Sequence, residues 1–146
     1  MNDVELKRNL HKLFNEQKLA VLSSNMQNQP YPSLIAFTCT EDLKNFIIVT
    51  LRNSNKYRNI MNNPQVSLLV DNRENQPSDF SNAIAVSVFG KAEEIQNDLN
   101  LFRNLYLKKH PYLEDFVKLP DCTLLKINVE KYSVVSQFQK VQELKV

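Results

Sequence analysis

The sequence predicts a mainly β protein with short helices, in which about six antiparallel strands form a small closed or nearly closed barrel. Two observations support this prediction. Short runs rich in Ile, Val and Phe, which are typical of strands, recur along the chain with turn residues between them. Segments with a helical spacing of apolar residues are few and mostly short. Closure into a barrel removes the edges that a flat sheet leaves exposed.

The first predicted element is an amphipathic helix over residues 3–18. Its apolar residues recur at helical spacing with charged residues between them, at Val4, Leu6, Leu10, Leu13 and Phe14. Two strands are predicted next, over residues 19–24 and 31–40. The tract from Asn25 to Pro30 between them favours a turn, so the two strands should pair as a hairpin.

The central unit, residues 46–70, is predicted to be a strand, a short helix and a second strand. Residues 46–50 are apolar and β-branched, and the run is too short for a buried helix. Ser54 is a good N-cap for a helix that continues to Asn62, before Pro64 ends it. The run from residue 65 to residue 70 then predicts a strand.

A polar loop over residues 71–81 leads to a long predicted strand over residues 83–95. This strand contains Gly90, the single glycine of the chain, which predicts a bulge or a close approach of another backbone. The remaining predicted elements are a helix, a short helical or irregular piece and a last strand, over residues 96–109, 112–118 and 122–136.

With one glycine, the chain needs other residues at left-handed backbone positions. Asparagine tolerates this conformation best after glycine. We therefore expect the asparagines of the predicted loops to take these positions, namely Asn25, Asn28, Asn45, Asn53, Asn63, Asn72 and Asn75.

Composition limits the function classes. The 146 residues are expected to form one domain over residues 1–146, and 42% hydrophobic with 23% charged residues is ordinary for a soluble globular protein. No apolar run approaches the roughly 20 residues of a membrane span, so no membrane partner is expected. The N-terminus lacks the apolar core of a secretory signal, which favours a cytoplasmic protein. A net charge of +2 is too small to indicate nucleic-acid binding.

The sequence shows no metal site and no residue that stands out as a catalytic acid, base or nucleophile. Cys39 and Cys122 are far apart and lack a Cys-x-x-Cys pattern, so neither a disulfide framework nor a zinc site is indicated. His11 and His110 have no second ligand at metal spacing.

Three cations gather at the start of the central helix. Arg52 precedes Ser54, and Lys56 and Arg58 follow in the first turn. A helix N-terminus already carries about half a positive elementary charge, so each cation there costs on the order of 0.3 to 1 kcal/mol unless an anion offsets it. Free backbone N–H groups, a serine hydroxyl and cations around one point indicate a phosphate site. The alternative is that these cations are solvated surface charges.

Several segments occur together in an ordered pattern. They are a strand ending in Thr50, the segment Arg52-x-Ser54-x-Lys56, the helix exit over residues 62–69 and the strand segment Gly90-Lys91-Ala92-Glu93. With the hairpin segment Pro30-Tyr31-Pro32-Ser33, their order and spacing resemble the pyridoxamine 5'-phosphate oxidase family over roughly residues 5–136. The resemblance implies a six-stranded antiparallel split β-barrel that binds FMN.

Carried over by position, the resemblance implies that Ser54 and Lys56 hold the FMN phosphate, with Arg52 close by. It implies that the ribityl chain and the flavin ring lie against two strands, at Val49, Thr50 and Leu51 and at Ser33, Leu34 and Ile35. It also implies a homodimer with the flavin at the interface, so that the second subunit completes the pocket.

The sequence departs from the vitamin B6 enzyme of this family. Asn55 stands where that enzyme has a basic residue after the serine, and the strand from Tyr31 to Phe37 has no Arg or Lys. Ala85 replaces a glutamine, and the C-terminal segment lacks the Arg-x-His substrate motif. Oxidation of pyridoxamine phosphate is therefore not expected.

The leading hypothesis is an FMN-binding oxidoreductase that transfers hydride or electrons from a small-molecule donor to an unidentified small-molecule acceptor. Such a protein needs no titratable catalytic group, because the flavin carries the chemistry. One alternative is a haem-binding protein of the same fold, with His11 or His110 as an axial ligand. Others are a deazaflavin in place of FMN, and a non-catalytic barrel with solvated cations.

Overall fold

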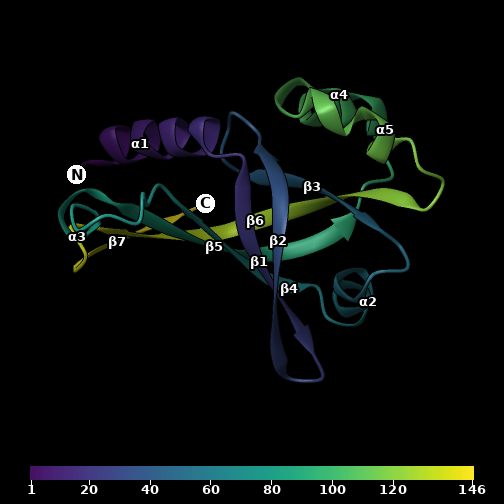
Figure 1. Cartoon of the computed structure of the whole chain (residues 1–146), viewed down its shortest axis with the longest axis horizontal. Helices are drawn as coiled ribbons and strands as arrows, with labels where there is room; N and C mark the ends of the chain where they lie inside the picture. The colour runs from purple at the N-terminus through teal and green to yellow at the C-terminus, as the bar shows by residue number, and fades with distance from the viewer.

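A computed structural model describes all of residues 1–146 (Figure 1). The strands, in chain order, are β1 (Leu19–Met26), β2 (Gln29–Cys39), β3 (Asn45–Leu51), β4 (Gln65–Asp71), β5 (Ile84–Glu94), β6 (Cys122–Ser136) and β7 (Lys140–Lys145). The helices are α1 (Asp3–Glu16), α2 (Asn55–Asn62), α3 (Asp79–Asn82), α4 (Leu99–Lys109), the 3₁₀ turn η1 (Pro111–Leu113) and α5 (Glu114–Val117).

All seven strands form one antiparallel sheet in the order β3-β2-β1-β4-β5-β6-β7. Because β3 also pairs with β6, six of the strands close into a barrel, which confirms the predicted fold. The long strand β6 pairs with β5 along one edge. Along its other edge, residues Cys122–Asn128 pair with β3 and residues Lys131–Ser136 pair with β7.

The prediction missed two elements. The loop predicted over residues 71–81 contains the start of the one-turn helix α3, and the segment after residue 136 forms β7. Strand β6 has the predicted bounds, and α2 begins directly after its N-cap Ser54.

The prediction that asparagines take the left-handed positions was wrong for five of the seven. Among them only Asn28 and Asn75 have a positive φ. Asn45 is paired within β3, and Asn63 is an extended C-cap of α2 with φ of −146°. The other left-handed residues are Gln27, Leu43, Asp98, Gln137 and Phe138.

Gly90 fulfils both predicted roles, although its φ is not positive. The register of β5 on β6 shifts between Phe89 and Gly90, as in a bulge. A Cβ atom at position 90 would lie 2.3 Å from the Asn128 carbonyl oxygen, so only glycine allows this approach of the two backbones.

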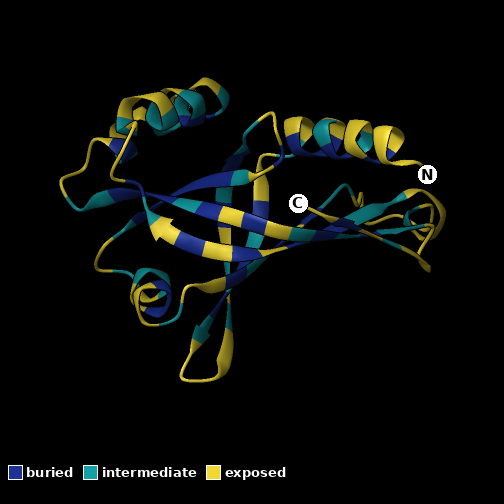
Figure 2. Ribbon diagram, turned by 180° about the vertical axis from the view of Figure 1, so that it is seen from behind, coloured by how far each residue is buried: buried dark blue, intermediate teal, exposed yellow.

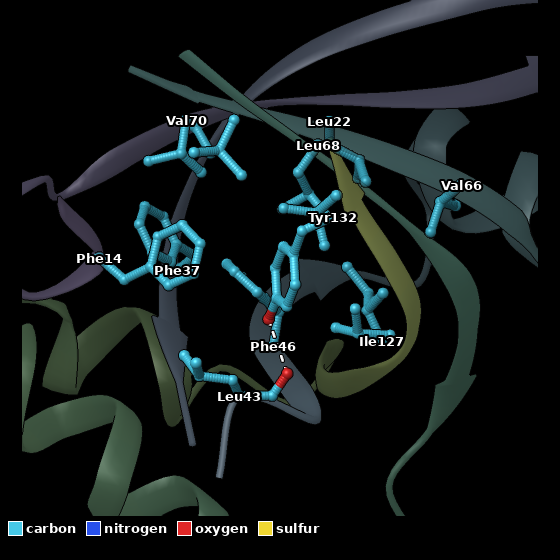
Figure 3. Packing of buried hydrophobic residues seen from close by; sticks show 14 of the residues in the cluster. Phe14, Leu22, Phe37, Leu43, Phe46, Val66, Leu68, Val70, Ile127 and Tyr132 are labelled. Carbon is cyan, nitrogen blue, oxygen red and sulfur yellow. Dashed lines mark hydrogen bonds between the residues drawn. The ribbon is translucent and has the colours of Figure 1, made fainter. Parts of the chain in front are cut away.

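The main core fills the barrel with aliphatic and aromatic side chains (Figure 3). Phe14 of α1 contacts the rings of Phe37, Phe46 and Tyr132, so α1 covers one end of the barrel. The buried Tyr132 hydroxyl donates to the Leu43 carbonyl at 2.7 Å, which satisfies its polar group inside the core. Both cysteines are partly buried free thiols.

A second, smaller core lies outside the barrel, where α4 and α5 pack on β3 and β6 (Figure 2). It includes Ile47 and Val49 of β3 together with Tyr106 of α4. The side chains of β3 therefore alternate between two cores, which explains why this strand is a continuous apolar run. No helix in the structure has the length and apolar character needed to cross a membrane.

Candidate functional site

The barrel is incomplete between β2 and β3. Although β2 has 11 residues, it pairs with β3 only over Phe37–Cys39, against Phe46–Ile48. Beyond this point β3 continues to Leu51 on β6, while β2 continues on β1 alone. We call the space between the unpaired edges of Gln29–Ala36 and Val49–Leu51 the split.

The backbone groups that face the split follow from the register. Pro30 and Pro32 have no N–H, so in the alternating antiparallel pattern the even-numbered residues of β2 point away from β1. The Tyr106 hydroxyl agrees with this direction, because it reaches the Ala36 carbonyl from α4 at 3.3 Å. The N–H and C=O of Leu34 therefore face the split without a strand partner.

The start of α2 lies where β3 leaves the barrel. The Ser54 side chain caps the helix by accepting the Tyr57 N–H at 3.2 Å, and it lies 2.9 Å from the Thr50 hydroxyl. The backbone N–H groups of Asn55 and Lys56 have no acceptor within the chain, and neither has the ammonium group of Lys56. Three unpaired donors therefore lie within one helical turn.

The other two cations have intramolecular partners. Arg52 forms an ion pair with Glu94 of β5 at 3.4 Å, and Arg58 donates to the Asn53 carbonyl at 3.0 Å and to the side chain of Asn55. The Tyr57 hydroxyl also donates to Glu94, and these bonds, Tyr57 first and Arg52 after it, hold the pKa of that carboxyl below its usual value. Lys56 is the cation that remains available.

The residues expected beside a flavin ring differ in burial. Leu34 is 69% exposed, whereas Ile35, Val49 and Thr50 are buried. Val49 belongs to the outer core, and the Thr50 hydroxyl is bonded to Ser54. Ser33 and Leu51 are partly buried. A ligand in the split would therefore meet mainly backbone of both strands and the exposed side chain of Leu34.

The split is open in the single chain. Asn55 and Leu34 each line the margin of a hollow, but these are two separate hollows, and neither is lined by Ser54, Lys56 or Val49. Neither hollow therefore joins the donors at α2 to the free edge of β2.

Sequence reasoning missed the residues that shape this corner. Glu94 fixes Arg52, and the Asp121 carboxylate accepts the Asn53 N–H at 3.1 Å, which fixes the turn before α2. Both acidic residues are far from the turn in sequence and reach it through the pairing of β5 and β6 with their neighbours. No local pattern marks them.

A closed six-stranded barrel with a split between two strands defines the split-barrel class. The family model for pyridoxamine 5'-phosphate oxidase matches residues 6–136, and the chain belongs to this family. A search of curated protein sequences gave no match.

Solved structures show the same fold. General Stress Protein 26 from Bacillus anthracis is 21% identical, with a TM-score of 0.72 over 97% of this chain and 99% of that chain. A FAD-binding protein from Mesorhizobium loti is 19% identical, with a TM-score of 0.70 over 87% of this chain and 90% of that one. A heme binding protein from Mycobacterium smegmatis is 13% identical, with a TM-score of 0.84 over 95% of this chain and 57% of that one.

Proposed function

We propose that the protein binds FMN in the split and acts as an oxidoreductase that passes hydride or electrons between a small-molecule donor and a small-molecule acceptor. The observation that carries the proposal is the start of α2, where unpaired donors gather beside an unpaired strand edge. Membership in the pyridoxamine 5'-phosphate oxidase family and the likeness to a FAD-binding protein support a flavin.

The phosphate of FMN would take the donors at the helix start. The N–H groups of Asn55 and Lys56 and the positive end of the helix attract a dianion, and the Lys56 ammonium adds a charge-assisted hydrogen bond. Ser54 keeps the helix start in place through its cap and its contact with Thr50. Arg52 contributes at longer range, because Glu94 holds its guanidinium.

The flavin ring would lie along the split. Leu34 offers a backbone N–H and C=O there, and β3 offers the edge at Val49. When bound, the flavin supplies the hydride or electron transfer itself. The chain has to bind and orient the ring and exclude water.

We also propose a homodimer in which the second copy covers the split. Leu34 and Leu69 flank Val21 in one row of paired residues on the outside of the sheet, and they are 69% and 38% exposed. Phe89 is 38% exposed on the same face. A row of apolar side chains beside an open site is typical of an interface. Sedimentation should give twice 17.0 kDa; a monomer at high concentration contradicts a shared flavin site.

The test of flavin binding combines the visible spectrum with a titration. We expect yellow protein and a dissociation constant for FMN that rises more than tenfold in Lys56→Ala, since a charge-assisted contact contributes about 1.5 to 3 kcal/mol. Lys12→Ala, on the exposed face of α1, is the matched control and should bind FMN normally. Colourless protein without FMN binding at micromolar levels refutes the proposal; an unchanged constant in Lys56→Ala places the phosphate elsewhere.

Haem is the less supported ligand. His110 is 2% exposed, and its Nε2 lies 2.7 Å from the Phe37 carbonyl oxygen. This ring nitrogen is therefore buried and hydrogen-bonded within the chain, which disfavours it as a haem ligand. Burial also lowers the pKa of His110. A Soret band that appears after haem addition and disappears in His110→Ala would favour haem over flavin. Competition binding between FMN and a deazaflavin would show which of the two flavins the protein prefers.

A further inference from the structure

A hollow of about 420 Å³ lies between α2 and the hairpin of β1 and β2 (Figure 1). Its volume falls in the range of sites for small molecules, roughly 300 to 1,000 Å³. We call it the asparagine hollow, because carboxamide side chains make up most of its lining. The hairpin turn and α2 supply Gln27, Asn28, Asn55, Arg58, Asn59 and Asn62.

The asparagine hollow is continuous with the start of α2. The residues that α2 places in the lining are three or four positions apart, so they lie on one face of the helix. The first of them is Asn55, whose backbone N–H is one of the unpaired donors at the helix start. The hollow therefore begins where the donors for a phosphate lie and extends along the helix away from them.

A buried acceptor is aimed into the hollow. Asn59 is 6% exposed, and its Nδ2 donates to the Ser24 hydroxyl at 3.2 Å, which fixes the side chain. Its Oδ1 accepts no hydrogen bond within the chain. No fully buried side-chain polar atom of the protein lacks a partner, so this oxygen is open to the hollow that Asn59 lines. Buried polar groups are ordinarily paired, and an open one indicates a ligand.

The groups around this acceptor suit the edge of a flat heterocycle. The side chains of Gln27, Asn28 and Asn62 make no hydrogen bond within the chain, and each offers both donors and acceptors. Met26 is 42% exposed at the same hollow and offers an apolar surface to a ring. A carboxamide pairs well with the neighbouring donor and acceptor of adenine. The lining therefore matches a purine base better than an ionic or a purely apolar ligand.

Two cations follow each other from the helix start into the hollow. Lys56 is unpaired at the start of α2, and Arg58 lines the hollow. Arg58 donates to the Asn53 carbonyl and to the side chain of Asn55, and these neutral partners leave its positive charge unbalanced. A diphosphate carries a negative charge on each phosphate, so it can use both cations, whereas a single phosphate at the helix start uses mainly Lys56.

We propose that the asparagine hollow holds the adenosine of FAD, with the second phosphate beside Arg58 and the FMN half of the molecule in the split. The proposal rests on the proposed flavin site and extends it past the start of α2. The hollow stays accessible in the proposed dimer, because Met26 lies on the face of β1 opposite to Val21, which belongs to the interface row.

The experiment is a calorimetric titration of the protein with FMN and with FAD. We expect FAD to bind about tenfold more tightly, as a few additional hydrogen bonds would give. Asn62→Ala and Met26→Ser should each weaken FAD about fivefold and leave FMN unchanged, since both side chains lie beyond the first phosphate. Lys56→Ala should weaken both flavins, because both place a phosphate at the helix start.

The matched control is Asn104→Ala, which removes an exposed asparagine from α4 and should leave both dissociation constants unchanged. The adenosine site is overturned if FAD binds no more tightly than FMN. It is also overturned if Asn62→Ala and Met26→Ser leave FAD unchanged or weaken FMN as much as FAD. In each of these results FMN still binds, so the flavin site in the split stands. If neither flavin binds, the flavin site is refuted, and the adenosine site with it.

Discussion

The two edges of β3 differ, although they belong to one strand. Its edge toward β6 is paired over all seven residues, Asn45–Leu51, and closes the barrel. Its edge toward β2 is paired over three residues and then opens into the split. Where β3 is fully paired with β6, its backbone groups are used within the sheet. Where β3 is not paired with β2, backbone groups remain available to a ligand. The difference shows that a continuous apolar strand can serve the core and a binding site at once.

The difference between the two edges does not come from hydrophobicity. It comes from which backbone groups of β2 are able to pair with β3. Pro30 and Pro32 remove two N–H groups that would face β3, so continued pairing of β2 with β3 would gain little. The Tyr106 hydroxyl donates a hydrogen bond to the Ala36 carbonyl at the point where the strands separate. The prolines of β2 and the tyrosine of α4 therefore determine where the split begins.

The largest expected effect tests which edge of β2 carries stability. Ile35 faces β1 in the register, opposite Ala20, so Ile35→Pro removes a ladder hydrogen bond and leaves a buried carbonyl unpaired. We expect a loss of about 3 kcal/mol of unfolding free energy. Leu34 faces the split, so Leu34→Pro should cost less than about 1 kcal/mol. Urea unfolding of both variants measures this.

The same pair separates stability from binding. Leu34→Pro removes a donor that faces the split, so it should weaken FMN while the protein stays folded. Equal destabilisation by the two prolines would show that Leu34 is paired in solution and that the split is closed.

The next largest effect concerns the closed side of the barrel. An added Cβ at Gly90 would lie 2.3 Å from the Asn128 carbonyl oxygen, which is a backbone atom and cannot turn aside, so Gly90→Ala forces β5 and β6 apart. We expect a loss of about 1 to 3 kcal/mol in chemical unfolding. Ala92→Ser, at a buried position two residues on, is a polar control without a backbone clash. A neutral Gly90→Ala would mean that the bulge relaxes freely.

The sequence predicted the barrel because its strands are apolar runs separated by turn residues, and the bounds of β6 follow from such a run. It could not predict β7, in which Leu144 is the single buried residue and the others are polar or exposed. That strand forms through backbone pairing with β6, which leaves no hydrophobic pattern. The helix α3 has four residues and no buried side chain, so it lacks a periodic signal as well.

The candidate site shows the same limit. The N-cap Ser54 was predictable, because capping depends on neighbouring residues, and the structure confirms it. The pairing of Arg52 with Glu94 was not, because the partners are 42 residues apart and meet only through the barrel. The roles of Ser54 and Lys56 in holding a phosphate stay predictions.

The smallest expected effect concerns the anchor of α4, which ends the pairing of β2 with β3. Lys109 donates to the Phe14 carbonyl at 2.6 Å and lies 3.8 Å from the centroid of the Phe37 ring. Burial lowers the pKa of Lys109 from 10.5 to about 8. The unfolded chain then holds more protons than the folded protein above pH 8, so this group makes stability rise with pH.

The titration of Cys39 limits the pH range in which the effect of Lys109 on stability can be measured. Burial raises the pKa of that thiol from 9.0 to about 12, so its contribution falls as the pH rises above 9. Urea unfolding between pH 8 and pH 9 should therefore show stability rising with pH in the wild type and a flatter slope in Lys109→Met, which keeps the apolar stem. Lys108→Met, at the exposed neighbouring position, should keep the wild-type slope. The same slope in Lys109→Met and the wild type would show that the ammonium group is solvated and that α4 holds the end of the split through Tyr106 and His110 alone.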